Sequence, residues 1–467
     1  MGTLSSLMDL SREALMADQA ALNVTAGNVA NQNTPGYTRQ VVSWQQTDAV
    51  TLSGQVYSTG ITSTALSQRS RILEQRVQQQ TQTHAQSGAL ESALQQVENI
   101  FGLTSSATSV SLTALGSATD AFFNSFSALE ANPSDAATRQ GVLAAANNLV
   151  SVFNSSASQL AQVASGLNRQ IVSVTGQINT LTATIASLNR QIAHTDPQTD
   201  AGVLEDQRQY AITQLSQYVG LDQMTTEANG ITLTTSNGAL LVSGSQSYAM
   251  NTTLAAGTIH VLAGGGGQDV TSGLTGGQLG GILEARDQKL PGYASALDSL
   301  AYGIGTAVNA QNALGVDGSG NPGTAIFTLP PTAAGAAASI QVATSDPQAV
   351  AVAAPGEGSA GNSNAIALAE LATANLVGTQ TATGFLASFL GQIGNDTAGA
   401  ATNNTVQQAT LTQLTSQRNA LSGVSLDEEA SNLTQYQRSY EAAAKVFSIV
   451  NTIMASALNL GVETTVA

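Results

Sequence analysis

Residues 426–460 have the sequence LDEEASNLTQYQRSYEAAAKVFSIVNTIMASALNL, and this stretch decides the fold. Apolar side chains recur in it at alternating steps of three and four residues, the spacing of a helix with one apolar seam. The seam comprises Leu433, Tyr436, Tyr440, Ala443, Phe447, Val450, Met454 and Ala457. Three carboxylates at 427–429 suit the positive end of the helix dipole, and Gly461 follows as a stop signal. Because a lone amphipathic helix is marginal in water, this stretch predicts a helix that needs a partner.

The beginning of the chain supplies the expected partner helix. The same three-and-four spacing is found at Leu4, Met8, Ser11, Leu15, Asp18 and Leu22. We therefore predict that the two chain ends pack together as a coiled coil. Two of the seam positions are polar and many neighbouring side chains are small. We therefore expect the pair to be weak alone and to gain stability when neighbouring subunits cover it.

Composition excludes several classes of function. The 467 residues carry 14 Lys and Arg against 30 Asp and Glu, a formal net charge of −16, which argues against a nucleic-acid partner or an anionic membrane. There is no cysteine, so neither a disulfide framework nor a cysteine-based site is expected. No apolar run approaches the roughly 18 residues of a membrane helix. The N-terminus also lacks the pattern of a secretory signal, so a soluble chain without a cleaved leader is expected.

Periodicity and turn residues predict a mainly α fold, a long antiparallel helical bundle with a terminal coiled-coil domain and a small β-rich insert. Helices are predicted over 66–101, 160–192, 203–219, 277–311 and 365–420, the last interrupted near Gly394. The pairs Asn229-Gly230 and Asn237-Gly238 are hairpin turn signals. The predicted parts are a terminal coiled-coil domain (1–62 and 421–467), a helical bundle domain (63–220, 276–312 and 363–420), a β-rich outer insert (221–275), and a loop with short strands (313–362).

No group of residues in the sequence predicts a catalytic, cofactor or metal site. His84, His194 and His260 show none of the spacings of metal-binding helices, and surface positions explain them best. The carboxylates at 205–206 and 427–429 are explained as charges at helix starts rather than as an acid–base pair. No nucleophile elbow is found. We therefore expect no catalytic residue, no cofactor and no metal.

Three stretches resemble a known family. Residues 28–37 (NVANQNTPGY) look like the signature shared by rod, hook and hook-associated axial proteins, and 436–446 (YQRSYEAAAKV) are similar to their common C-terminal helix. Residues 276–287 (GGQLGGILEARD), followed by 290–293 (LPGY), resemble the central segment of the flagellar hook-associated protein 1 family. Gly27 stands where an Asn is common, and the insert is short beside that of longer members.

The resemblance implies a structural role at the junction between flagellar hook and filament. It implies export through the flagellar type III apparatus and assembly as a ring of copies of itself on the hook tip, outside the cell. The implied partners are the hook protein, the second junction protein (hook-associated protein 3), and an export chaperone on the C-terminal helix, with no nucleic acid and no membrane. The candidate assembly-interface residues are Leu4, Met8, Leu15, Leu22, Leu433, Tyr436, Tyr440, Phe447 and Val450.

Two alternatives remain beside this interpretation. The first is a hook or distal-rod axial subunit, which the central segment at 276–287 disfavours. The second is a secreted enzyme with a coiled-coil stalk, for instance a peptidoglycan hydrolase. That class would need a catalytic domain of its own, and residues 221–355 supply no plausible acid pair or metal cluster.

Overall fold

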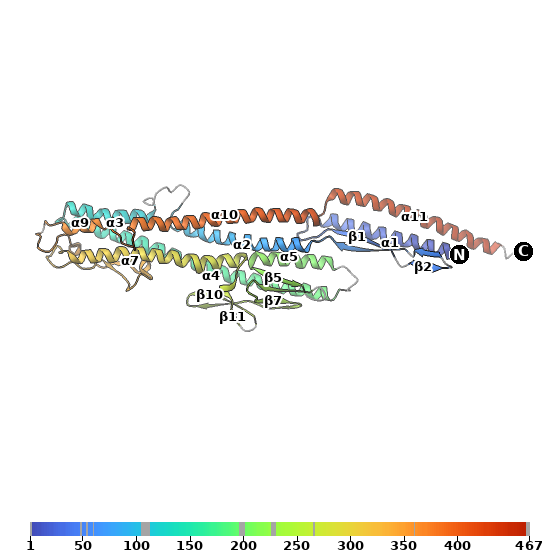
Figure 1. The fold of residues 1–467 in the computed structure, drawn as a ribbon, viewed down its shortest axis with the longest axis horizontal. Coiled ribbons are helices and arrows are strands. Elements are labelled where there is room, and N and C mark those ends of the chain that lie inside the picture. Colours follow the sequence, from blue (N-terminus) through green and yellow to red (C-terminus); the bar gives the residue numbers. More distant parts are fainter. Residues whose placement is uncertain are drawn as a thin grey trace.

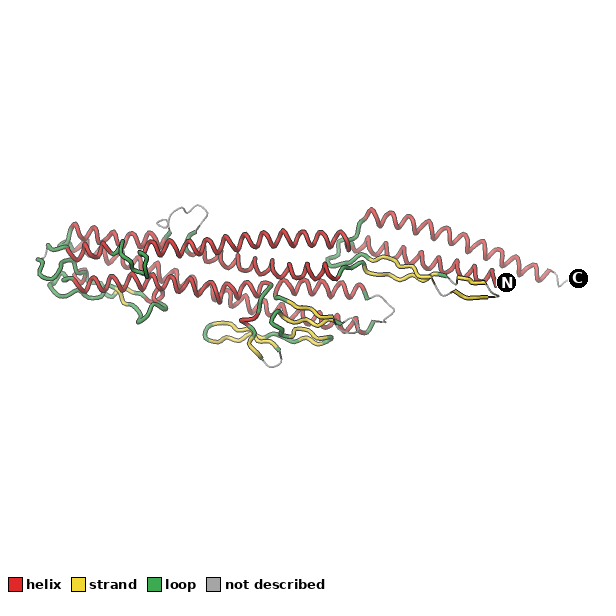
Figure 2. The backbone as a smooth tube through the Cα atoms, viewed as in Figure 1, coloured by secondary structure: helices red, strands yellow, loops and turns green. Residues whose placement is uncertain are grey.

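The computed structural model describes residues 2–463 except 47–48, 53–54, 59, 104–112, 196–200, 226–229, 265–266 and 359. The described chain is elongated: long helices run side by side over most of its length, and both termini lie at the same end (Figure 1). Small sheets lie on one side of the helices and beside the first helix (Figure 2). The predicted fold class, mainly α with paired terminal helices and a small β-rich insert, is confirmed.

The two chain ends form what we call the terminal layer. It consists of α1 (Gly2–Asn31), the strands β1 (Gln40–Gln46), β2 (Ala49–Leu52), β3 (Gln55–Ser58) and β4 (Ile61–Ser67), and α11 (Leu426–Glu463). Helices α1 and α11 pack against each other and run in opposite directions, and the antiparallel pair β1–β4 lies beside α1 (Figure 1). The helix predicted from Leu66 is wrong at its start, because Leu66 pairs with Val41 in β4. The predicted domain boundary at residue 62 therefore falls inside a strand.

The remaining long helices form what we call the rod. They are α2 (Arg71–Ile100), α3 (Ala114–Ala131), α4 (Ala136–Ala193), α5 (Gly202–Tyr218), α6 (Gly277–Glu284), a π-helical turn (Ala285–Lys289), α7 (Leu290–Leu314), α9 (Ser363–Glu370) and α10 (Ala382–Ser422). At 1.5 Å per residue, the 58 residues of α4 span about 87 Å. The predicted hairpin of α4 with α5 is confirmed by their packing.

Three helix predictions in the rod are corrected. Helix α4 begins at Ala136 rather than near residue 160, because Asp135 accepts a hydrogen bond from the backbone N–H of Ala137 and caps the helix. Helix α3 was not predicted from the sequence. Helix α10 is continuous through Gly394, and the interruption lies earlier, before Thr381 caps the helix start.

The apolar core belongs to the rod. At the end away from the termini, Phe122 lies between Phe126 and Phe327, with ring centroids 5.1 and 5.5 Å apart, and Phe101 meets Phe389 edge-on at 5.1 Å. Each fully buried side chain of this size contributes roughly 1.5–3 kcal/mol. Among the described residues of the terminal layer, the buried apolar side chains are those of Ala17, Ala21 and Val450. The rod therefore has a substantial core of its own, whereas the terminal layer has very little.

The β-rich insert lies on one side of the rod and contains two antiparallel sheets (Figure 2). One contains β5 (Leu221–Thr225), β6 (Ile231–Thr235), β7 (Leu240–Ser243) and β8 (Gln246–Ser247); the other contains β9 (Asn251–Ala255), β10 (Thr258–Ala263) and β11 (Gln268–Asp269). The predicted turn at Asn237-Gly238 joins β6 to β7, with Gly238 at a φ of +83°. Asn229 of the other predicted turn lies outside the described residues.

The loop segment after α7 closes the far end of the rod. Strands β12 (Phe327–Thr328) and β13 (Gln341–Val342) pair antiparallel, and the short helix α8 (Ala336–Ser339) lies between them in sequence. This confirms the short strand pair expected there.

Candidate assembly interface

The seam between α1 and α11 is small and polar near its centre. Ser11 and Asp18, the two polar seam positions noted in the sequence, are both buried. The Asp18 carboxylate accepts a hydrogen bond of 2.9 Å from the hydroxyl of Ser439 on α11. Small side chains, Ala17 and Ala21, bring the two helices close together. Hydrogen bonds at a few positions therefore fix the pairing of the helices, while little apolar surface is buried.

Asn28 joins three segments at the rod end of this seam. Its amide nitrogen donates to the Glu429 carboxylate at 3.1 Å and to the Gln40 carbonyl at 2.8 Å. Its amide oxygen accepts from the Tyr37 hydroxyl at 2.9 Å and from the Gln40 backbone N–H at 3.0 Å. Arg39 adds an ion pair of 2.8 Å to the same Glu429. The Asn-rich signature that begins in the last turn of α1 thus joins α1, β1 and the start of α11.

The structure places the nine predicted interface residues in three different environments. Val450 is 2% exposed and lies in the pair. Half-buried positions are occupied by Leu4, Met8, Leu15, Leu22, Tyr436 and Phe447. Tyr436 contacts Trp44 of β1, with 6.2 Å between ring centroids. Leu433 and Tyr440 are each 38% exposed and so are only partly covered by this chain. Asn28 and Glu429 were not among the predicted interface residues, because both are polar and the prediction rested on the apolar positions of the seam.

Large apolar side chains are exposed along the whole terminal layer. The exposed set comprises Leu7, Leu10, Met16, Val29, Val41, Trp44, Leu66, Leu426, Leu433, Tyr440, Val446, Ile449, Ile453 and Leu458, each between 36% and 59% exposed. Soluble proteins seldom leave such surfaces open unless another molecule covers them. The terminal layer is therefore the candidate site of assembly.

One described helical stretch, Ala382–Leu458, is long and apolar enough to cross a membrane by length and composition. An 18-residue window in it has a mean hydropathy of 1.2, and 6% of that window is buried. With few charges present, scattered apolar and small side chains raise the mean hydropathy of this stretch without forming one continuous apolar run. A single such helix is weak evidence for a membrane span.

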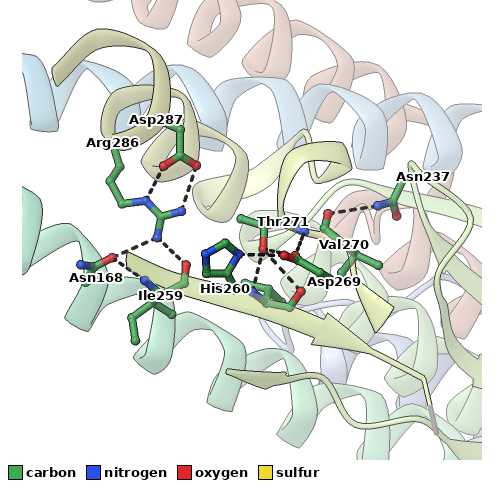
Figure 3. A network of polar contacts seen from close by, with 10 residues as sticks. Asn168, Asn237, Ile259, His260, Asp269, Val270, Thr271, Arg286 and Asp287 are labelled. Atoms are coloured by element: carbon green, nitrogen blue, oxygen red, sulfur yellow. Dashed lines mark hydrogen bonds and ion pairs between the residues drawn. The ribbon is translucent and has the colours of Figure 1, made fainter. Parts of the chain in front are cut away.

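A second set of contacts fixes the β-rich insert to the rod. The guanidinium of Arg286, which is 6% exposed, donates to the Ile259 carbonyl at 2.6 Å and to the Asn168 amide oxygen at 2.9 Å. Asp287 pairs with the other side of the guanidinium, at 2.7 and 2.9 Å (Figure 3). On the same sheet, Nδ1 of His260 lies 2.7 Å from the Asp269 carboxylate. The Arg286 contacts hold the insert against the rod, and the contact between His260 and Asp269 lies within the sheet.

Asparagines of α4 anchor the insert at two further places. Asn179 bonds both the carbonyl and the N–H of Met250, at 2.7 and 2.8 Å, and Asn189 donates to the carbonyls of Ile231 and Gly244 at 3.0 and 2.8 Å. Together with Asn168, they recur about every three turns along one helix face. This spacing is the signal in the sequence that could have revealed the anchoring face.

The glycine-rich segment at 276–287 has a packing role. A Cβ atom on Gly281 would lie 2.2 Å from the Gln86 carbonyl oxygen, and one on Gly277 would lie 2.3 Å from the Val219 backbone nitrogen. Gly276 and Gly277 also have positive φ values of 73° and 62°. Helix α6 can therefore approach α2 and the end of α5 only because side chains are absent at these positions.

The described residues contain no group of three or more His, Cys, Asp or Glu side chains that could hold a metal ion. The contacts reported above join one segment of the chain to another.

Comparison with known proteins gives the same class at both chain ends. Residues 8–38 match the family model described as flagella basal body rod protein, and residues 416–460 match the model described as flagellar basal body rod FlgEFG protein C-terminal. The terminal layer therefore has the sequence character of flagellar axial proteins. Residues 94–327, half of the chain, match the model described as flagellar hook-associated protein FlgK helical domain. The chain belongs to the flagellar hook-associated protein FlgK family, which is a family of structural flagellar proteins.

Individual relatives span nearly the whole chain. The flagellar hook-associated protein 1 of Bacillus subtilis (strain 168) is 29% identical and covers 97% of this chain and 97% of the relative. That of Escherichia coli (strain K12) is 26% identical, covering 98% and 100%. The solved structure of the flagellar hook junction protein FlgK from Burkholderia pseudomallei superposes with a TM-score of 0.69 at 19% identity, covering 74% of this chain and all of that one.

Proposed function

We propose that this chain is a structural adaptor that assembles on the tip of the flagellar hook, outside the cell, and connects the hook to the filament. Full-length similarity to hook-associated proteins 1 supports this position. The observation that carries the proposal is the contrast between the well-packed rod and the terminal layer, whose large apolar side chains stay exposed in one copy. Burying them between subunits supplies stability that a single copy lacks.

The proposed interface comprises the nine residues predicted from sequence, in two roles. Val450 and the half-buried members hold α1 against α11. Leu433 and Tyr440, together with exposed neighbours such as Ile449 and Ile453, contact adjacent subunits. The proposed partners are further copies in a ring, the hook protein on one side and hook-associated protein 3 on the other. A chaperone covering α11 before export would hide the same exposed side chains.

The adaptor needs no cofactor, metal or catalysis in this proposal. Every polar cluster described above is engaged in contacts within the chain, and the family is structural. Nucleic acid and membrane are not among the proposed partners. The second candidate function is a hook or distal-rod subunit; the family matches at both chain ends are compatible with it because rod proteins share them, whereas the match over residues 94–327 disfavours it.

Electron microscopy of isolated, uncapped hooks incubated with the purified chain tests the proposal. We expect additional density at the hook tip from the full chain and none from a version lacking residues 426–467. We also expect Ile453→Asp, which puts a charge on the exposed side of α11, to abolish decoration.

The matched control is Leu254→Asp, because Leu254 is equally apolar and 67% exposed but lies on the insert. This variant should decorate hooks like the unmodified chain. Long tubes formed by the full chain alone, without hook binding, would identify a rod or hook subunit instead. Binding to lipid vesicles in place of hooks would indicate that the apolar face of α11 meets a membrane.

A further inference from the structure

The rod and the terminal layer meet at what we call the knee, formed by residues 32–39, 67–74, 202–210 and 418–429. At this point the axis of α11 is displaced from that of α10 (Figure 1). Two backbone groups of the terminal layer bond across the knee: the N–H of Thr38 donates to the Asp206 carboxylate, and the N–H of Arg39 donates to the Ser422 carbonyl, both at 2.9 Å. Asp206 thus connects α5 of the rod directly to the chain leaving α1.

Beside this connection, the guanidinium of Arg69 pairs with three carboxylates. Arg69 lies 3.2 Å from Glu74 and 3.3 Å from Glu205, and it also pairs with Asp206. The four side chains are only 6% to 18% exposed. Three negative charges around one positive charge in a place with little water repel one another strongly. Glu74 is the carboxylate whose negative charge is least stabilised, because Asp206 also accepts a hydrogen bond from the Thr38 N–H.

Other charged or titratable groups face Glu74 from three sides. Arg418 of α10 and Arg71 of α2 lie around it, as does Arg208 of α5. Arg418 donates to Asn419 at 2.8 Å, and Arg208 donates to Asn189 at 2.9 Å. Tyr37 and Tyr210 face it across a neighbouring cavity. The nearby cations are therefore engaged with amide oxygens as well as with the carboxylates.

Glu74 also lies between two cavities. One, of about 130 Å³, is lined by Arg69, Glu205 and Arg208. The other, of about 250 Å³, is lined by Tyr37, Thr38 and Arg418 among others. Both are large enough for water, so the carboxyl group has a route to exchange a proton and space to move.

The pKa of Glu74 is raised to about 7: burial raises it most, Arg69 and Arg418 oppose this shift, and the carboxylates of Asp206 and Glu205 add to it. A group whose pKa is raised in the folded state stabilises that state fully below its unfolded value of about 4.5. That contribution is lost as the pH rises through about 7. Neutral Glu74 therefore favours the closed knee, and ionised Glu74 favours its opening.

We propose that the knee is a proton-dependent latch, in which ionisation of Glu74 loosens the contact between the terminal layer and the rod by competing with Asp206 for Arg69. In acid the three-carboxylate cluster carries one charge less, and Asp206 keeps both Arg69 and the Thr38 N–H. Above neutral pH the excess negative charge weakens this attachment. The terminal layer of a single copy is then held to the rod less tightly.

Hydrogen exchange of the intact chain tests the latch through the backbone amides of Thr38 and Arg39. After correction for the intrinsic exchange rate, their protection should fall roughly 25-fold between pH 5.5 and pH 8, mostly below pH 7, if opening exposes Glu74 to water. In Glu74→Gln, which cannot ionise, protection should stay at the level seen in acid across this range.

Glu91→Gln is the matched control, because Glu91 lies on the same helix and accepts a hydrogen bond from Asn404 away from the knee. It should keep the pH dependence of the unmodified chain. Amides of α3 and α9, at the far end of the rod, report whether each variant remains folded. An unchanged pH slope in Glu74→Gln, or no slope in the unmodified chain, would overturn the latch.

Discussion

Asn28 illustrates how one polar side chain defines the geometry of an otherwise weakly packed region. It uses both amide hydrogens and its oxygen in bonds to Gln40, Tyr37 and Glu429, and it is 1% exposed. Apolar seams tolerate small shifts along a helix, whereas hydrogen bonds with fixed directions do not. The relative position of α1 and α11 is therefore determined more by these bonds than by apolar burial.

Replacing Asn28 by Ala should destabilise the terminal layer by about 1–3 kcal/mol, because the backbone of Gln40 and the carboxylate of Glu429 each lose a hydrogen-bond partner. The chain's single tryptophan, Trp44, lies against Tyr436 in this layer and provides a local fluorescence probe. The midpoint of its urea transition should fall. Asn23→Ala, an exposed position on the same helix, should leave the midpoint unchanged; equal shifts in the two variants would contradict the assigned role.

Helix α6 shows at the scale of an element why a glycine-rich segment is part of the fold. Gly280 and Gly281 face neighbouring backbone so closely that any Cβ atom would clash. The following Arg286 then fixes the insert through Ile259 and Asn168. One short segment thus determines both the packing of α6 on α2 and the attachment of the insert to the rod.

Gly281→Ala should lower the thermal midpoint of the rod, with a loss of about 1–3 kcal/mol, because its new methyl group would overlap the Gln86 carbonyl and the Ala89 side chain. Gly292→Ala makes the same chemical change within α7, where nothing lies within 4 Å of the new atom. It should be neutral or stabilising by up to about 1 kcal/mol. Far-UV circular dichroism measures both, and a destabilised Gly292→Ala with an unaffected Gly281→Ala would refute the packing argument.

In the molecule as a whole, the rod and the terminal layer have apolar cores of different size and should therefore differ in stability. The rod buries clusters of Phe, Leu and Ile, whereas few large apolar side chains of the terminal layer are buried. We propose that the two parts unfold separately, with the terminal layer opening first. Such a division lets the rod remain folded while the terminal layer adapts to its neighbours in an assembly.

Phe447→Asp should disrupt the terminal layer and abolish assembly on hooks while leaving the rod folded, because Phe447 lies half-buried on α11, far along the chain from the rod core. Trp44 fluorescence should lose its cooperative transition, and the main circular dichroism transition should keep its midpoint. A simultaneous fall in both midpoints would show that the two parts unfold as one unit.

Features that depend on local periodicity could be predicted from the amino-acid sequence. The seam of α11, the partner helix at the other chain end, the α4–α5 hairpin and the turn at Asn237-Gly238 all follow from spacing or turn chemistry within a few residues. The seam residues of the proposed interface could be predicted in the same way. The sequence could not predict that the helix pair covers Val450 but leaves Leu433 partly exposed.

Other features depend on packing between distant segments. The pairing of Arg69 with Glu205 and Asp206, and the bond from Asn28 to Glu429, join residues far apart along the chain. The early start of α4 and the continuity of α10 through Gly394 likewise depend on caps and neighbours rather than on period. The energy of polar contacts between distant segments depends on burial, which exists only once those segments have packed together.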